Sequence, residues 1–316
     1  DYVDPMDPSD KSRLWQIRTP EGNIDFTYLC SNKIGTISKD LESISYIYDG
    51  KLVTSETLAG TVNHSLDYTY NTDFDVSSFT YAGQTQNYTY DNDGLLTGAG
   101  RSAVTRNTSN ALPESVSSTS LDLSRMFNGY GEISAQSVSV GGQSLFNWDL
   151  TLDGTGRLTE KTETVNGTTT SYAYTYDEMG RLLTVTKDGS LVEEYQYNAN
   201  GSRTYEMNTQ RGITGRNLSY SAEDHLLSAG SATYEYDVDG FLQSKTDGSD
   251  VTTYDYSSRG ELSSVDLPDG TFIEYIHDPL GRRIAKKVDG TTVEKYLWQG
   301  MTRLLAVYDG AANLIM

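Results

Sequence analysis

One nine-residue pattern, repeated along almost the whole chain, most constrains how this sequence folds. Its clearest copy runs from Tyr174 to Leu182 and reads Tyr-Thr-Tyr-Asp-Glu-Met-Gly-Arg-Leu. Tyr174 and Tyr176 are two residues apart, so on a β-strand both side chains point to the same face. Asp177 begins a type I turn well, and Gly180 adopts positive φ without strain. The pattern therefore predicts a strand, a turn and a returning strand.

The pattern recurs about every 21 residues, which is the signature of a repeat architecture. We anchor each copy on the residue before the turn, and these anchors lie at positions 28, 48, 70, 90, 106, 127, 152, 176, 197, 220, 236, 256, 277 and 298. The residues that define the clearest copies are Tyr90, Asp91, Gly94, Tyr176, Asp177, Gly180, Tyr197, Tyr236, Asp237, Gly240, Tyr256, Gly260, Tyr275, Asp278, Gly281 and Trp298. Copies between residues 98 and 160 are weaker, which we interpret as degenerate repeats with longer loops.

A second kind of turn is expected between successive anchors. Asn-Gly and Asp-Gly pairs favour two-residue type I′ hairpin turns; they are Asn166-Gly167, Asp188-Gly189, Asp247-Gly248, Asp269-Gly270 and Asp289-Gly290. Each repeat then supplies two antiparallel strands, and no helical periodicity of useful length competes. We predict an all-β fold of tandem antiparallel β-hairpins, on the order of 26 to 28 strands. Strand twist accumulates at about 20–25° per strand, so the sheet should coil into a spiral or shell-like wall.

The repeats also suggest how the chain is divided. Residues 1–23, with Pro5, Pro8 and Pro20, precede the first repeat and are expected to form an N-terminal leading or cap segment. Residues 24–316 are expected to form one repeat domain, cut from a longer precursor. An open spiral leaves its last strands unpaired. We therefore expect the edge from Tyr296 to Tyr308 to fray or to associate with a partner.

Composition excludes several classes of function. The net charge of −20 repels phosphate backbones and anionic membrane surfaces, so we expect no nucleic-acid partner. Cys30 is the one cysteine, so no internal disulfide can form. No apolar run is long enough for a transmembrane helix, and we expect no membrane insertion.

The sequence offers no catalytic, cofactor-binding or metal-binding constellation, and we predict that the chain is not an enzyme. His64, His225 and His277 are far apart and fit no zinc-ligand spacing. The turns that begin at Asp91 and Asp237 resemble calcium loops but lack the later bidentate Glu. Turn chemistry explains these carboxylates, and the sequence leaves open whether calcium binds them.

The unit Tyr-x-Tyr-Asp-x-x-Gly-Arg-Leu resembles the YD repeat of the Rhs (rearrangement hotspot) and teneurin families. The run from Tyr275 to Ile284, followed by Tyr296-Leu-Trp298 and Arg303-Leu-Leu-Ala306, is similar to the end of the repeat region in bacterial Rhs proteins. The resemblance implies β-hairpins that spiral into a hollow shell, which holds a cytotoxic domain in bacterial toxins and serves adhesion in teneurins. Asp278-Pro279-Leu280-Gly281 is superficially similar to an Rhs self-cleavage motif, but we interpret it as a repeat turn.

Two functional hypotheses follow from the pattern and the resemblance. The first is a structural scaffold: a shell wall that encloses or presents another polypeptide, such as a toxin outside this chain. Its partners would be the rest of the precursor, toxin cargo or neighbouring subunits. The alternative is an extracellular adhesion module whose aromatic residues bind glycans. Either role implies a secreted or cell-surface location, and we favour a bacterial source.

Overall fold

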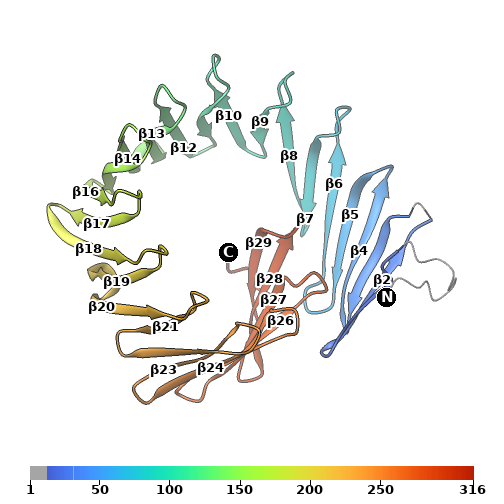
Figure 1. Ribbon diagram of the computed structural model, residues 1–316. Helices are drawn as coiled ribbons and strands as arrows, with labels where there is room; N and C mark the ends of the chain where they lie inside the picture. The colour runs from blue at the N-terminus through green and yellow to red at the C-terminus, as the bar shows by residue number, and fades with distance from the viewer. Residues whose placement is uncertain (1–12, 31) are drawn as a thin grey trace. The chain divides into compact units, whose positions relative to one another are not determined.

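The computed structural model describes residues 13–30 and 32–316, and these residues form 29 β-strands (Figure 1). One 3₁₀ turn, η1 (Thr209–Arg211), is the sole helical element in the described ranges. No helix there is long and apolar enough to span a membrane. The prediction of an all-β, antiparallel hairpin fold is confirmed.

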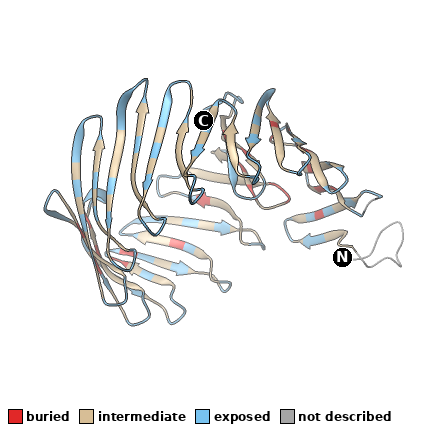
Figure 2. Cartoon of the chain, turned by 90° about the horizontal axis from the view of Figure 1, so that it is seen from above, coloured by how far each residue is buried: buried red, intermediate tan, exposed pale blue. Residues whose placement is uncertain are grey.

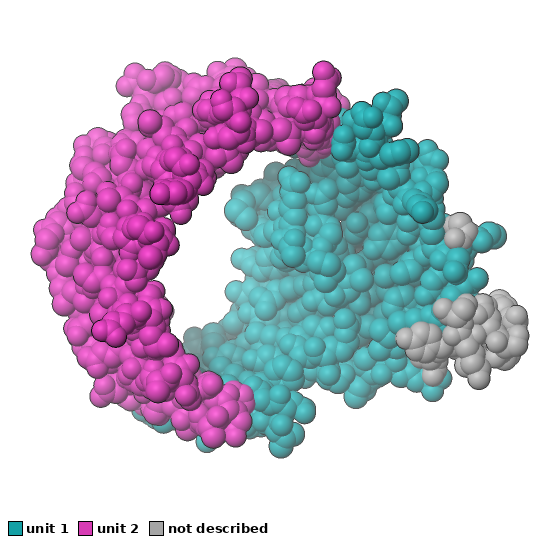
Figure 3. Space-filling view, turned by 45° about the horizontal axis from the view of Figure 1, so that its top comes forward, with its two compact units in different colours: residues 1–86, 232–316 teal, residues 87–231 magenta. Residues whose placement is uncertain are grey.

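The chain divides into two compact units, which Figure 3 colours separately. Unit 1 combines residues 1–86 and 232–316, and unit 2 comprises residues 87–231. In unit 1 the first seven strands are β1 (Gln16–Thr19), β2 (Gly22–Tyr28), β3 (Ile34–Lys39), β4 (Glu42–Asp49), β5 (Leu52–Ala59), β6 (His64–Tyr70) and β7 (Val76–Tyr81). The others are β22 (Ala232–Tyr236), β23 (Leu242–Asp247), β24 (Asp250–Tyr256), β25 (Leu262–Asp266), β26 (Phe272–His277), β27 (Arg283–Val288), β28 (Thr291–Gln299) and β29 (Arg303–Asp309).

Strand β8 (Gln84–Tyr90) spans the boundary between the units. Unit 2 then continues with β9 (Leu96–Ala99), β10 (Ser102–Arg106), β11 (Pro113–Ser117), β12 (Leu121–Phe127), β13 (Ile133–Val140), β14 (Gln143–Leu152) and β15 (Leu158–Val165). It ends with β16 (Thr168–Tyr176), β17 (Leu182–Lys187), β18 (Ser190–Tyr197), β19 (Arg203–Asn208), β20 (Ile213–Tyr220) and β21 (Leu226–Ala229). Within each of the groups β1–β7, β8–β21 and β22–β29, every strand pairs antiparallel with the next one in sequence.

The repeat register predicted from the sequence matches the strand ends. All fourteen anchors lie at the end of an even-numbered strand, from Tyr28 in β2 to Trp298 in β28. Twelve of them are the last strand residue, while Tyr48 and Trp298 are each followed by one more. The agreement follows from local chemistry, since the turn residues that come next cannot continue a strand.

The two-residue turns follow the prediction at three of the five places. Both residues have positive φ at Asn166-Gly167, Asp188-Gly189 and Asp289-Gly290, as a type I′ turn requires. At Asp247-Gly248 the prediction is wrong. Asp247 pairs with Asp250 across the hairpin, and Gly248 alone has positive φ, which is the type II′ pattern.

Asp269-Gly270 also departs from the prediction, because it lies inside a wider turn that begins at Leu267. The Leu267 amide donates to the Thr271 carbonyl at 3.0 Å, and the Gly270 amide donates to the Leu267 carbonyl at 2.9 Å. Pro268 accounts for the shift. Its fixed φ suits the second position of a turn, so the turn starts one residue earlier.

The expected boundary at residue 23 needs correction, because it falls inside β2. β1 and β2 already form a hairpin with Ile17 opposite Ile24, and the Tyr28 hydroxyl donates to the Leu14 carbonyl at 2.9 Å. Apolar alternation is sufficient to make this hairpin although the Tyr-Asp turn is absent. The part of the leading segment before Arg13 lies outside the described residues.

Unit 1 is built from two layers, and the strands of these layers contain most of the buried residues (Figure 2). We call β1–β7 the N-terminal layer and β22–β29 the C-terminal layer. Contacts between them include Gln299 Nε2 with the Tyr68 hydroxyl at 3.2 Å and the His64 ring stacked on Tyr308. The largest fully buried side chains are Phe79, Ile24, Ile44, Leu66, Ile284 and Leu297. The repeat pattern alone, read as one sheet, did not predict this dry core.

Unit 2 has a different construction, with a single curved layer of strands (Figure 3). Val185, Tyr195 and Ala229 are its buried hydrophobic residues among those the structure describes. Along β16 the side chains alternate as predicted: Tyr174 and Tyr176 are half-buried, whereas Thr175 is exposed. Stability in this unit therefore depends on contacts between neighbouring strands.

The C-terminal edge is partly covered, because the last residues fold back and pair with the end of β29 from Val307 to Asp309. The Val307 amide donates to the Met316 carbonyl, and the Ile315 amide donates to the Val307 carbonyl, both at 2.8 Å. Leu297 and Ala306 are 0% and 2% exposed. The last residues pair with the end of β29 and the layer beneath buries part of its side chains, and the expectation that this edge frays or associates with a partner stays a prediction.

Candidate functional site: the repeat turns and a buried charge cluster

Each YD turn is organised around one side-chain oxygen. Asp177 Oδ1 accepts the backbone N–H groups of Met179 at 2.9 Å and Arg181 at 2.8 Å. Gly180, with φ of 81°, donates its own N–H to the Asp177 carbonyl. The same two side-chain bonds occur at Asp91, Asp153, Asp237, Asp278, Asn71 and Asn128. Ser221 and Ser257 accept the equivalent N–H groups with their hydroxyls, so the repeat uses Asp, Asn or Ser as the acceptor at this position.

These hydrogen bonds affect whether the turn carboxylates are available to bind calcium. The backbone N–H of Arg181 is the main cause that lowers the pKa of Asp177, because hydrogen bonds favour the carboxylate form. In Asp91 and Asp237 the same oxygen is occupied by the turn amides. Across the described ranges, no group of three or more His, Cys, Asp or Glu side chains is arranged to hold a metal ion.

The anchor side chains connect each repeat to the one before it. The Tyr197 hydroxyl donates to the Leu182 carbonyl at 2.9 Å, and the Tyr176 hydroxyl donates to the Leu158 carbonyl at 2.7 Å. Each acceptor is the first strand residue after the preceding turn. Trp298 keeps this link with a different atom, since its Nε1 donates to the Arg283 carbonyl at 2.7 Å.

The Arg that follows the turn Gly adds a second link. Arg181 Nε donates to Asp177 Oδ2 at 2.6 Å, and its Nη1 donates to the Asn198 carbonyl of the next turn at 3.0 Å. Its guanidinium carbon lies 4.6 Å from the centroid of the Tyr197 ring, within the range of a cation–π contact. Tyr, Asp, Gly and Arg thus hold neighbouring hairpins together.

Replacing Tyr197 with Phe should destabilise unit 2 by about 1 kcal/mol. The substitution keeps the ring but leaves the Leu182 carbonyl without its side-chain donor. Urea unfolding followed by circular dichroism measures the change. Tyr130→Phe is the matched control, because Tyr130 is 92% exposed and should tolerate the change. Equal midpoints for the two variants would mean that the link between repeats contributes nothing.

One copy of the turn is buried and carries an additional charge. Arg282 Nε donates to Asp278 Oδ2 at 2.6 Å, as Arg181 does to Asp177. Asp278 and Arg282, however, are only 3% and 4% exposed. Arg282 Nη1 also donates to the Gly300 carbonyl at 2.8 Å and lies 3.4 Å from Glu56 Oε1. Glu56 belongs to β5 in the N-terminal layer and is 7% exposed. We call Glu56, Asp278 and Arg282 the buried charge cluster.

The pattern of turns and links coincides with a known family. A family model, Teneurin YD-shell, matches residues 9–314. The chain belongs to the Teneurin YD-shell family. This confirms the resemblance to YD repeats that the sequence motif indicated.

This YD-shell chain spans only a small part of the length of the curated relatives that it matches. Mouse Teneurin-3 is 26% identical over 327 residues, a match that covers 96% of this chain and 12% of Teneurin-3. The double-stranded DNA deaminase toxin A of Burkholderia cenocepacia (strain H111) is 29% identical over 164 residues, covering 47% of this chain and 11% of that protein. The crystal structure of TcdB2-TccC3-TEV has a TM-score of 0.54 at 13% identity and covers 96% of this chain and 20% of that one. At this identity the structural match shows the fold alone.

The buried charge cluster of this YD-shell has an unequal balance of charge, with two carboxylates and one guanidinium. Burial raises the pKa of Glu56, while the positive charge of Arg282 opposes the shift. Burial, with Glu56 nearby, also raises the pKa of Tyr46 to about 12. Arg282 Nη2 is buried without a hydrogen-bond partner. The cluster therefore holds the two layers together at a cost in desolvation.

Glu56→Gln should leave stability unchanged or raise it at pH 7.5. Because the pKa of Glu56 is raised in the folded state, its contribution to stability is present below the unfolded pKa and is lost as pH rises through the folded pKa. Gln has the shape of the protonated acid, and Arg282 keeps its bonds to Asp278 and Gly300. Urea midpoints of both proteins between pH 4 and pH 8 measure the effect. A large loss at pH 7.5 would show that the Glu56 charge is needed.

The structure distributes the predicted repeat residues rather than gathering them. Tyr90, Tyr176, Tyr197, Tyr236 and Tyr256 end their strands, and Tyr275 lies two residues before the anchor His277. The turn glycines all have positive φ: Gly94, Gly180, Gly240, Gly260 and Gly281. Two of the predicted repeat residues come close to the contact between the layers: Asp278 pairs with Arg282 near Glu56, and Tyr275 lines a cleft with Lys39. The sequence did not single out Glu56, Tyr68 or Gln299, because their roles depend on a partner more than 200 residues away.

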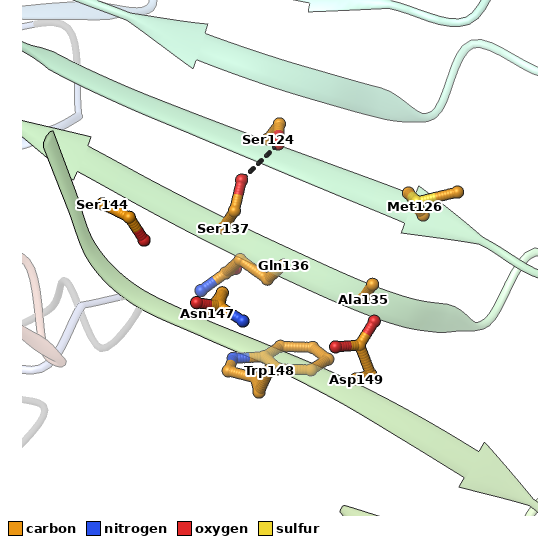
Figure 4. Close-up of a pocket in the computed structure, with 9 residues that line it drawn as sticks. All are labelled: Ser124, Met126, Ala135, Gln136, Ser137, Ser144, Asn147, Trp148 and Asp149. Carbon is orange, nitrogen blue, oxygen red and sulfur yellow. Dashed lines mark hydrogen bonds between the residues drawn. The ribbon is translucent and has the colours of Figure 1, made fainter. Parts of the chain in front are cut away.

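A shallow pocket of about 270 Å³ lies on β12–β14 of unit 2 (Figure 4). Hydroxyl, amide and carboxylate groups line it together with Trp148, and Ser124 and Ser137 share a hydrogen bond of 2.7 Å. Its lining contains no histidine, cysteine or lysine that would activate a nucleophile. The side chains of Ser137, Asn147 and Asp149 share one face of the sheet, where they can form hydrogen bonds, and Trp148 shares the opposite face with Gln136.

Proposed function

We propose that this YD-shell chain is a non-catalytic structural wall that encloses or presents another polypeptide, such as a toxin. The observation that carries the proposal is the use of the repeat's polar groups. The turn Asp, the Arg and the anchor Tyr are committed to hydrogen bonds within and between hairpins. Because these polar groups already form hydrogen bonds that hold the sheet together, they support a role as a scaffold rather than as an active site.

The similar proteins support the same proposal for partners. One bacterial relative is named as a toxin, and this chain matches 11% of its length. We propose that the repeat hairpins, beginning with β1 and β2, act together beside toxin cargo, neighbouring subunits or other parts of a longer protein. A secreted or cell-surface location and a bacterial source are part of this proposal.

Protease protection in the full-length protein tests the enclosing role. The intact protein is digested under native conditions, and peptides that survive are identified by mass spectrometry. We expect a segment outside the YD-shell to survive with it and to be cut once the shell is unfolded in urea. Equally rapid cleavage of every such segment in native buffer and in urea would refute enclosure.

The pocket around Trp148 gives a specific reason to keep glycan binding as a second candidate. Trp148 is paired with Gln136 across β13 and β14, so the ring and the amide share one face of the sheet and offer the stacking and hydrogen bonding that sugar rings use. A glycan array probed with this chain tests it, with Trp148→Ala as the variant that should lose binding. Absence of binding by the unmodified chain would remove the adhesion alternative.

A further inference from the structure

Two of the three histidines lie where the layers of unit 1 meet. His64 begins β6 in the N-terminal layer, and its ring stacks on Tyr308 of β29, with centroids 5.3 Å apart and planes at 17°. His277 ends β26 in the C-terminal layer and lines a cleft of about 400 Å³ with Lys39 of β3. His277 occupies the anchor position, where most of the other repeats have Tyr. The remaining histidine, His225, belongs to unit 2.

Charged groups from both layers surround His277. The positive ones are Lys39, Lys287, Arg282 and Arg283, and the negative ones are Glu21, Asp40, Glu42, Glu261 and Asp278. Most of these carboxylates already have donors. Glu21 accepts from Ser258 at 2.7 and 2.8 Å, Glu42 accepts from the Thr61 hydroxyl at 2.6 Å, and Asp278 accepts from Arg282. Glu261 accepts from the Ser257 hydroxyl and pairs with Arg259 at 3.3 Å.

Neither histidine has an anionic partner of its own. Among the described residues, no hydrogen bond or ion pair joins either imidazole to a carboxylate. The smaller cleft beside His64, about 270 Å³, is lined by Lys295 and Tyr308 and contains no carboxylate. A proton added to either ring would therefore place a positive charge in a half-buried contact that already contains lysine or arginine.

Burial is the main cause that lowers the pKa of both histidines. At His277 the nearby Glu261 opposes this shift, and Arg283 adds to it. The pKa directions thus agree with the geometry, in which both rings are half-buried and neither is bonded to a carboxylate.

We infer that mild acid loosens the contact between the N-terminal and C-terminal layers of unit 1, with His64 and His277 as the groups that take up the protons. This inference rests on the contact within unit 1 and does not depend on the proposed function. The contact between the two layers of unit 1 would then open more readily at mildly acidic pH than at neutral pH.

The direction and the size of the effect follow from proton linkage. A histidine whose folded-state pKa is lowered contributes stability above its unfolded value, about 6.5, and loses it as pH falls through that value toward the folded pKa. Between pH 6.5 and 5.5, each histidine changes the opening equilibrium by at most about tenfold. Glu56 acts in the opposite direction, since burial raises its pKa and protonation favours the folded contact.

Hydrogen exchange on the whole chain at pH 7.5 and pH 5.5, corrected for intrinsic exchange rates, tests the inference. Protection of β28 and β29 should fall at the lower pH by up to about a hundredfold. Strands β14–β16 in unit 2 are the internal reference and should keep their protection. The variant His64→Phe with His277→Tyr keeps the stacked ring and supplies the usual anchor residue, and it should abolish the loss. His225→Gln is the control variant and should retain it.

Three results would overturn the inference. They are equal protection of β28 and β29 at both pH values, an unchanged acid loss in the double variant, and an equal loss in β14–β16. If the double variant fails to fold, the two single variants replace it, and each should remove part of the loss. Glu56→Gln removes the opposing effect and should make the acid loss larger, whereas a smaller loss would contradict the assignment of these groups.

Discussion

Replacing Arg282 with Ala is expected to lower the free energy of unfolding of unit 1 by about 3–5 kcal/mol. The substitution leaves Glu56 and Asp278, which are 7% and 3% exposed, buried together without a counter-charge. It also removes a donor from the Gly300 carbonyl. Urea unfolding at pH 7.5 measures the loss, with the hydrogen exchange of β27–β29 used to detect unfolding of unit 1.

Arg181→Ala is the matched control for Arg282→Ala. Arg181 makes the same contacts in its own repeat, with a carboxylate four residues earlier and a carbonyl of the next turn. Its side chain is 26% exposed, against 2% for Arg282, so water replaces much of what is lost. The loss should be much smaller than at Arg282. Equal losses at the two positions would mean that the buried charge cluster has no special role.

Replacing Leu297 with Ala should cost about 2–5 kcal/mol, because the side chain is 0% exposed between the layers of unit 1 and its removal leaves a cavity. Ile47→Ala is a close control. Both residues are the middle of a Tyr-x-aromatic triplet at an anchor, but Ile47 is 62% exposed. Thermal and urea unfolding of both variants measures the contrast. Similar midpoints would show that the buried face of the C-terminal layer adds no stability.

The comparison of Leu297 with Ile47 also explains what the sequence could not supply. In most repeats the residue between the two aromatic positions is polar, as Thr175 and Asp255 are, and it faces solvent. At Ile276 and Leu297 it is apolar, a signal that this face is covered. Ile47 carries the same signal and is exposed. Local sequence therefore indicated a candidate face but did not determine which candidate is covered.

The two-residue turns also show that a local sequence signal can be overridden by its surroundings. Asn166-Gly167 and Asp188-Gly189 form the expected turn because two residues suffice to set their backbone. Asp269-Gly270 does not, because Pro268 begins the turn one residue earlier. At Asp247-Gly248 the pairing of the flanking strands moves the loop by one residue. These errors arise where a neighbouring residue or strand competes with the two-residue signal.

The sequence by itself determined the repeat: the strand ends, the antiparallel hairpins and the turn at each Asp-x-x-Gly. These depend on residues within about one repeat of each other, whose bonding preferences are local. The tertiary structure alone decided that β1–β7 and β22–β29 form two layers, and that Glu56 meets Arg282. Contacts across more than 200 residues depend on the accumulated twist of the strands between them, and no single motif records that twist.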